Sequence, residues 1–205
     1  MISSVIYGAP GCGKSTTIVD AVAQRISQGT DPDSILLLSF TKSAATVLAK
    51  RAGLKRGCAA TLHSCCFRLL GLTKDQVVDR HKLKELASKT RVEVTGASVY
   101  DDEAPGRGDQ YLAAYKYARA RLIPHEDAFS MVDGSGTYRE YMYFVEHYEE
   151  WKRANGYVDF DDMISDATGT TSIGDTQVLF LDEAQDFSEA QWKLINSWVH
   201  EVGEV

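Results

Sequence analysis

The chain has 205 residues, of which 44% are hydrophobic and 25% are charged, which is the composition of an ordinary soluble protein with a substantial core. No apolar run approaches the roughly 20 residues that cross a bilayer, and residues 1–4 form no basic leader, so we expect a cytoplasmic protein with no membrane partner. The net charge of −7 argues against a protein that coats nucleic acid by bulk attraction.

The first part of the chain predicts alternating strands and helices. Ile2–Tyr7 is a short apolar run that predicts a buried strand, and apolar residues at helical spacing predict a helix over Lys14–Gln28. A second apolar strand, Ile35–Leu38, precedes a helix over about 43–52, and a third short strand at about 59–61 leads into another helix. Continuous apolar strands that alternate with helices predict an α/β fold with a parallel sheet covered on both faces.

The middle of the chain has a different pattern, and the first pattern then returns. From about Thr73 the sequence predicts polar helices separated by loops rich in Gly, Asp and Pro, without a strong strand signal. These helices are expected near 81–89, 110–122 and 139–153. A buried strand at Val178–Leu181 and an amphipathic helix at Glu189–Val199 follow. We therefore expect an α/β domain over 1–72 and 157–205, with an inserted helical subdomain over 73–156.

The four cysteines lack the paired spacing of a zinc site, and two of them are adjacent. We expect buried, reduced thiols. The cysteines are Cys12, Cys58, Cys65 and Cys66.

A phosphate-binding motif lies between the first predicted strand and helix. Gly8–Ser15 matches G-x-x-x-x-G-K-[ST], in which glycines let backbone N–H groups turn around a phosphate and the helix N-terminus adds partial positive charge. Lys14 is expected to reach the β- and γ-phosphates, and the Ser15 hydroxyl to bind Mg²⁺. A glycine-rich turn with an incidental lysine is the alternative. The expected nucleotide-binding residues are Gly8, Ala9, Pro10, Gly11, Cys12, Gly13, Lys14, Ser15 and Thr16.

Two carboxylates follow the last predicted strand. Asp182 and Glu183 come directly after Val178–Leu181, at the strand end where ligands bind in open α/β sheets. In phosphoryl transfer the first carboxylate typically holds Mg²⁺, and the second orients and deprotonates an attacking water. Adjacent acids alone are more often a solvated loop. Together with the phosphate loop they predict an NTP hydrolase and not a passive nucleotide binder.

One stretch of the acidic chain is basic. No acidic residue lies between Ser34 and Lys74, whereas six basic residues do. A solvated helix face and a track for a phosphate backbone explain this charge equally well. The six residues are Lys42, Lys50, Arg51, Lys55, Arg56 and Arg68.

Four further segments resemble motifs of the UvrD/Rep/PcrA-type superfamily 1 DNA helicases, in the same order and at similar spacing. Ser39–Ala45 is similar to T-F-T-N-K-A-A and Thr61–Ser64 to T-F-H-S. Asp159–Met163 is similar to D-F-D-D-L and Asp182–Asp186 to D-E-x-Q-D. The resemblance covers Tyr7 to about Trp198, and it implies a RecA-like P-loop NTPase domain that binds ATP and Mg²⁺.

The resemblance also implies a role for individual residues. Lys14, Glu183 and Gln185 would be catalytic, with Glu183 on the attacking water and Gln185 sensing the γ-phosphate, while Ser15 and Asp182 would hold the metal. A single-stranded DNA track is implied at Phe40, Thr41, Lys42, Thr61 and His63. Phe40 belonging to the core, and His63 capping a helix or belonging to the core, are the alternatives.

The implied function is that of an ATP-dependent DNA helicase that moves 3′→5′ on single-stranded DNA and opens a duplex junction. A second RecA-like domain, which supplies arginines to the phosphate, would be expected past Val205. We therefore expect a truncated or split gene product that binds Mg-ATP but hydrolyses it slowly alone. A nucleotide-dependent switch that binds a protein partner, and an RNA-directed helicase of the same superfamily, are the alternatives.

Overall fold

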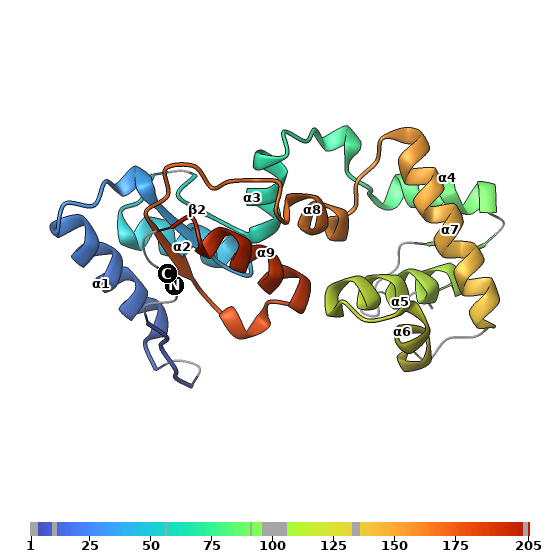
Figure 1. Ribbon diagram of the computed structural model, residues 1–205, viewed down its shortest axis with the longest axis horizontal. Helices are drawn as coiled ribbons and strands as arrows, with labels where there is room; N and C mark the ends of the chain where they lie inside the picture. Colours follow the sequence, from blue (N-terminus) through green and yellow to red (C-terminus); the bar gives the residue numbers. More distant parts are fainter. Residues whose placement is uncertain are drawn as a thin grey trace. The chain divides into compact units, whose positions relative to one another are not determined.

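The computed structural model describes residues 4–9, 12–55, 57–90, 92–95, 106–132, 136–202 and 205 (Figure 1). They form two compact units. The α/β unit comprises Met1–Gly71 and Ile164–Val205, and the helical unit comprises Leu72–Met163. The assignment of these parts to an ATP-binding domain and an inserted subdomain, with boundaries after residues 72 and 156, stays a prediction.

The α/β unit is built on a parallel sheet with the strand order β2-β1-β3. β1 (Ile35–Leu38) pairs with β2 (Ala59–Ala60) on one side and with β3 (Val178–Leu181) on the other. Leu38 is in register with both Ala60 and Leu181, so the three strands end in one row at the same edge of the sheet. This confirms the predicted α/β fold with a parallel sheet.

Helices pack around this sheet and begin at residues that cap them. They are α1 (Lys14–Ser27), α2 (Lys42–Ala52), α3 (Leu62–Leu69) and α9 (Glu189–Val199), with short 3₁₀ turns η1 (Pro32–Ser34) and η3 (Ala184–Asp186). The hydroxyl of Thr41 accepts a hydrogen bond from Ala44 N, and that of Thr61 accepts one from Ser64 N. A core of seven buried residues joins α1 and α2 to the sheet. Its members are Ile18, Val22, Ile35, Leu37, Leu48, Leu54 and Val178.

The predicted first strand is wrong for residues 4–7. This segment belongs to no strand, and the side chains of Val5, Ile6 and Tyr7 are 59%, 47% and 89% exposed. A strand exists only by pairing with a neighbour, and β3, the sheet's edge strand, pairs with β1 alone among the described strands. Apolar periodicity reports which residues can enter a sheet, but it does not report whether a partner strand is present. Residues 2 and 3 lie outside the described part.

The helical unit contains η2 (Lys74–Gln76), α4 (Arg80–Thr90), α5 (Arg107–Arg121), α6 (His125–Met131) and α7 (Tyr138–Asn155). α8 (Phe160–Ala167) begins in this unit and ends in the α/β unit. The helices near 81–89, 110–122 and 139–153 were expected, whereas α6 and α8 were not. The core is rich in aromatic rings that contact one another at tilted and stacked angles. Its largest members are Tyr111, Tyr115, Tyr141, Phe144, Tyr148 and Trp151.

The chain enters and leaves the helical unit side by side. Val78 N donates to Val158 O at 2.9 Å, and Val158 N donates to Gln76 O at 2.8 Å, so that Val77 and Val158 form an isolated parallel bridge. The sequence shows no strong strand signal in this region. A bridge of one residue pair is too short to produce a strand pattern in a sequence. Among the described helices, none is long and apolar enough to cross a membrane.

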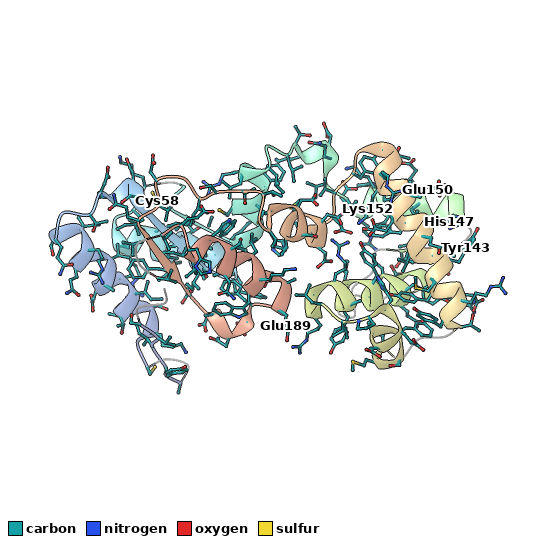
Figure 2. All side chains as sticks on the ribbon, viewed as in Figure 1. Cys58, Tyr143, His147, Glu150, Lys152 and Glu189 are labelled. Atoms are coloured by element: carbon teal, nitrogen blue, oxygen red, sulfur yellow. The ribbon has the colours of Figure 1, made fainter. Side chains whose placement is uncertain are left out.

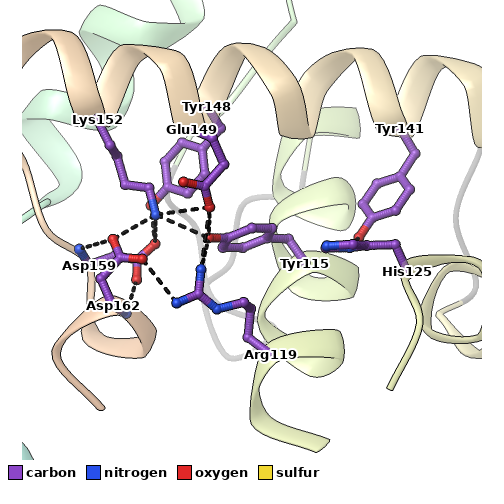
Figure 3. Close-up of polar contacts among 9 residues, drawn as sticks. All are labelled: Tyr115, Arg119, His125, Tyr141, Tyr148, Glu149, Lys152, Asp159 and Asp162. Carbon is purple, nitrogen blue, oxygen red and sulfur yellow. Dashed lines mark hydrogen bonds and ion pairs between the residues drawn. The ribbon is translucent and has the colours of Figure 1, made fainter. Parts of the chain in front are cut away.

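A buried lysine joins α5, α7 and α8 within the helical unit (Figure 3). Lys152 is 2% exposed, and its Nζ donates to Asp162 Oδ2 at 2.6 Å, Asp159 Oδ2 at 2.8 Å and Tyr115 OH at 3.0 Å. Arg119 forms an ion pair with Asp162 Oδ1 at 3.0 Å. Burial opposes the charged form of Lys152, but the carboxylates of Asp159 and Asp162 outweigh it and raise the pKa of the ammonium group.

The same two carboxylates cap α8. Asp162 N donates to Asp159 Oδ1 at 2.8 Å, and Asp159 N donates to Asp162 Oδ2 at 3.0 Å. The D-F-D-D segment is therefore a reciprocal cap held by a buried lysine. Figure 2 shows Tyr143 and His147 on the side of α7 away from Lys152. The ring centroids of these two residues are 3.9 Å apart.

Candidate active site

A cavity of about 300 Å³ lies along β3 in the α/β unit. All four residues of β3 line it, together with the segment 4–6 and one side of α1. At the C-terminal end of β3, four polar side chains line the same cavity. They are Lys14, Asp182, Glu183 and Gln185. The structure thus brings together the lysine of the phosphate loop and the acidic strand end, which are about 170 residues apart in the sequence.

The described part of the phosphate loop closes on itself ahead of α1. Lys14 Nζ donates to Gly8 O at 2.8 Å, and Cys12 N donates to Ala9 O at 3.2 Å. Gly13 has a φ of 94°, a left-handed conformation that favours glycine over any residue with a Cβ atom. Pro10 and Gly11, which the sequence also assigns to this loop, lie outside the described residues. The lysine is therefore held by its own loop, next to a helix N-terminus that can attract an anion.

Asp182 is the buried carboxylate of the site, at 4% exposure. Its N–H donates to Leu38 O at 2.8 Å, which continues the pairing of β1 and β3 by one residue. Its Oδ2 accepts a hydrogen bond from Ser39 Oγ at 3.0 Å. Burial raises the pKa of Asp182, and the hydrogen bond from Ser39 and the charge of Lys14 offset this only in part.

Ser39 was not predicted as a site residue, although it lies in the segment that resembles T-F-T-N-K-A-A. A signal was present in the sequence, because Ser39 and Asp182 each follow an apolar strand directly. It becomes usable once the register of Leu38 with Leu181 is known, since residues in register on parallel strands point to the same face.

Glu183 and Gln185 form a pair at the turn after β3. Gln185 Nε2 donates to Glu183 Oε2 at 2.6 Å. Glu183 has a φ of 51°, a left-handed conformation that costs a residue other than glycine roughly 1–2 kcal/mol. The structure keeps this strained residue at the wall of the cavity.

The residues of the predicted nucleic-acid track follow β1 and β2 at the same edge of the sheet. Phe40 and Thr41 come after β1, and Thr61 directly follows β2. Phe40 is 50% exposed, so the alternative that it belongs to the core is wrong. Lys42 is exposed at the start of α2, and His63 is partly buried in α3, where burial lowers its pKa.

Comparison with known proteins decides the family. A model of the UvrD/REP helicase N-terminal domain matches residues 3–204. The chain belongs to this family. It is also 25% identical over 215 residues to the Bacillus subtilis (strain 168) protein named "Putative ATP-dependent DNA helicase YjcD". That alignment covers 93% of this chain but 27% of the relative, so the chain spans about a quarter of the relative's length.

The donor set of this UvrD/REP helicase domain fits a metal that arrives with a nucleotide. Among the described residues, no group of three or more His, Cys, Asp or Glu side chains is placed to hold a metal. Mg²⁺ in nucleotide sites takes one or two protein oxygens and fills its remaining positions with phosphate and water, so a lone carboxylate such as Asp182 is sufficient. Ser15, the second predicted ligand, does not line the cavity with Lys14 and Asp182.

The cysteines of the UvrD/REP helicase domain are free thiols in different environments. Cys65 and Cys66 are buried as expected, and burial raises the pKa of Cys66 to about 12. Cys58, which is labelled in Figure 2, is partly buried, and Cys12 is exposed. The expectation of burial is wrong for Cys12 because the residue lies in the exposed phosphate loop.

Proposed function

We propose that this chain is the ATP-binding N-terminal part of an ATP-dependent DNA helicase that uses Mg-ATP hydrolysis to move along single-stranded DNA and unwind duplex. One observation carries the proposal. Lys14, Asp182, Glu183 and Gln185 line one cavity at the C-terminal edge of a parallel sheet, in a chain that belongs to the UvrD/REP helicase family. A cation, a buried carboxylate and a second carboxylate paired with an amide are the groups that phosphoryl transfer to water needs.

The phosphate loop would bind the nucleotide by exchanging internal contacts for phosphate contacts. Lys14 Nζ now meets the neutral carbonyl of Gly8. A phosphate oxygen carries charge, and charge-assisted hydrogen bonds are roughly twice as strong as neutral ones. Lys14 would therefore turn to the β- and γ-phosphates when a nucleotide enters, while the N–H groups at the start of α1 hold the same anion.

The acidic end of β3 would carry the hydrolysis. Asp182, with Ser15 if the loop brings it close, would hold Mg²⁺, which when bound neutralises charge on the phosphates. Glu183 would accept the proton of the attacking water, and Gln185 would exchange its hydrogen bond to Glu183 for one to the γ-phosphate. In this way the loss of one internal hydrogen bond would report that the γ-phosphate is present.

Nucleic acid would bind along the row of strand ends. The exposed ring of Phe40 can stack on a base without reading its identity, which is worth about 1–3 kcal/mol per base. Lys42 would contribute charge to the phosphate backbone. The hydroxyls of Thr41 and Thr61 cap α2 and α3. The N-terminal ends of these two helices would therefore face the bound nucleic-acid strand. We also propose that movement is 3′→5′, that the partners are single-stranded DNA and a duplex junction, and that a second RecA-like domain completes the site.

The test is steady-state ATP hydrolysis and nucleotide binding, each with and without single-stranded DNA. Glu183→Gln keeps the size of the side chain but removes the base, so we expect at least a 100-fold loss of turnover with retained Mg-ATP binding. Glu201→Gln, an exposed acid of the same unit, is the matched control. A Glu183→Gln variant that keeps a measurable wild-type turnover would sink the assignment. Negligible turnover in both proteins, with Mg-ATP binding retained, is the result expected if a second RecA-like domain has to complete the site. Equal response to RNA and DNA oligonucleotides would argue against a DNA-directed motor.

A further inference from the structure

The hydrogen bond between Ser39 and Asp182 joins two segments to which separate roles are proposed. Ser39 directly precedes Phe40 and Thr41 of the nucleic-acid track, and Asp182 is the carboxylate for the metal of the nucleotide. Both residues are buried, and Ser39 Oγ donates to Asp182 Oδ2 at 3.0 Å. The contact is thus a direct connection, one hydrogen bond long, between the two proposed binding sites.

The sheet holds both partners firmly in place. Ser39 N donates to Ala60 O at 3.0 Å, and Asp182 N donates to Leu38 O at 2.8 Å. With both N–H groups held by the sheet, the hydroxyl of Ser39 and the backbone N–H of Glu183, which also bonds to the carboxylate, together set how the carboxylate of Asp182 is turned. Oδ2 of Asp182 accepts the hydrogen bond from Ser39, and this bond helps to fix the plane of the carboxylate. The plane determines the direction in which Oδ1 can bind a metal. Groups that orient a metal ligand in this way tune metal affinity without touching the metal.

The chain on the other side of Ser39 leads to the exposed ring of Phe40. Thr41 then caps α2 through its bond with Ala44 N, so the segment 39–41 is tied at both ends while Phe40 between them is 50% exposed. A base stacked on Phe40 would act on a backbone that carries the Ser39 hydroxyl one residue away.

We propose that Ser39 is a positioning residue that orients Asp182 toward the metal of the nucleotide and makes this orientation respond to a nucleic-acid strand at Phe40. This inference rests on the proposed function. It predicts that single-stranded DNA lowers the Mg²⁺ concentration needed for nucleotide binding, and that this effect passes through one hydroxyl group.

The variants distinguish an effect of the Ser39 hydroxyl on the orientation of Asp182 from an effect of the Ser39 side-chain volume on packing. Ser39→Ala removes the hydroxyl, Ser39→Cys keeps the volume with a weak donor, and Ser39→Thr restores the hydroxyl on the residue type that the family motif carries at this place. Ser34→Ala is the matched control, because Ser34 is also buried, directly precedes β1 as Ser39 directly follows it, and donates to a backbone oxygen, Asp31 O, at 2.8 Å.

The measurement is a Mg²⁺ titration of the binding of a fluorescent ATP analogue to the full chain, with and without an oligo(dT) strand. We expect Ser39→Ala and Ser39→Cys to need about 10-fold more Mg²⁺ and to lose the shift caused by DNA. Binding of the analogue without Mg²⁺ should be unchanged in both. Ser39→Thr should regain the wild-type titration, and Ser34→Ala should never lose it.

Three negative outcomes are distinguishable. If Ser39→Ala and Ser39→Cys titrate like the wild type in both conditions, the hydroxyl has no positioning role, whatever their thermal stability. If the wild type binds no nucleotide at any Mg²⁺ concentration, the proposed function itself fails and the inference falls with it. An Mg²⁺ shift in Ser34→Ala equal to that in Ser39→Ala would likewise overturn the inference, because the loss of any buried serine next to β1 would then have the same effect.

Discussion

In the helical unit the buried cation Lys152 has three oxygen partners within 3.0 Å, two of them carboxylates, whereas in the α/β unit Lys14 borders a cavity and donates to the backbone oxygen of Gly8. The carboxylates differ in the same way. Asp159 and Asp162 are enclosed by Lys152 and by each other's N–H groups, but Asp182 and Glu183 line an open cavity. Removing one member of a buried ion pair leaves an uncompensated charge and lowers stability, whereas charged groups around a cavity are available for a ligand. The comparison predicts that changes in the first cluster act on folding and changes in the second act on binding.

Lys152→Ala is the largest test of this difference. It leaves Asp159 buried without its cation and Asp162 with Arg119 alone, and removing one partner of a buried ion pair typically costs about 3–5 kcal/mol. We expect the free energy of unfolding to fall by this amount, measured by denaturant titration, and hydrogen exchange to rise at the start of α8. Because the carboxylates are the cause, a triple variant with Lys152→Met, Asp159→Asn and Asp162→Asn should recover much of the loss.

Lys84→Ala, which removes an exposed lysine from α4, is the control for Lys152 and should change stability little. A Lys152→Ala variant as stable as this control would show that the closed cluster contributes nothing. The claim that changes in the Lys152 cluster act on folding would then be wrong.

Lys14→Ala should have the opposite profile. The loss of a charged donor to the phosphates is worth about 1.5–3 kcal/mol, so we expect ATP to bind roughly 10- to 100-fold more weakly. Stability should stay within about 0.5 kcal/mol of the wild type, because Lys14 is partly exposed and makes no buried ion pair in the described part of the chain. Isothermal titration with Mg-ATP and a thermal melt of the same sample measure both quantities. Lys193→Ala, an exposed lysine of α9, is the control, and an equal loss of affinity there would mean that general charge and not the phosphate loop holds the nucleotide.

The fold was predictable wherever a local pattern is sufficient. Ile35–Leu38 and Val178–Leu181 are strands because four consecutive apolar residues fit a covered parallel sheet, and Glu189–Val199 is a helix with the expected bounds. The segment Ile2–Tyr7 has the same kind of pattern, and yet its described residues are unpaired, because strand formation depends on a neighbour that no local pattern encodes. The cap of α8 was missed for a similar reason, since Lys152 looks like any surface lysine until the fold buries it.

The candidate site was predictable to the extent that chemistry follows strand ends. Lys14, Asp182 and Glu183 were expected near one another from their places after predicted elements, and they line one cavity. Their roles stay predictions. Ser39 was missed because its place directly after an apolar strand becomes a usable signal only when the strand register is known, and that register joins strands that are about 140 residues apart.

Asp161 gives the smallest effect and sharpens the comparison within the helical unit. It stands between the two capping carboxylates, and burial, together with the charge of Asp159 and to a smaller extent of Asp162, raises its pKa to about 6, against the opposing charges of Arg119 and Lys116. A carboxyl group with a raised pKa holds its proton more tightly in the folded state. Its contribution to stability is therefore lost as the pH rises from the unfolded value of 3.8 through about 6, and the loss is complete above that pH.

Asp161→Asn replaces the ionisable carboxyl group by a neutral amide, so the loss caused by ionisation disappears. We expect the variant to be more stable than the wild type by about 1–2 kcal/mol at pH 7.5 and equally stable near pH 4, measured by denaturant unfolding at several pH values. Glu150→Gln, an exposed carboxylate of α7 (Figure 2), should show no such pH-dependent difference. A stability difference that is constant with pH would mean that the substitution acts through packing. The ionised carboxylate of Asp161 would then not destabilise the helical unit.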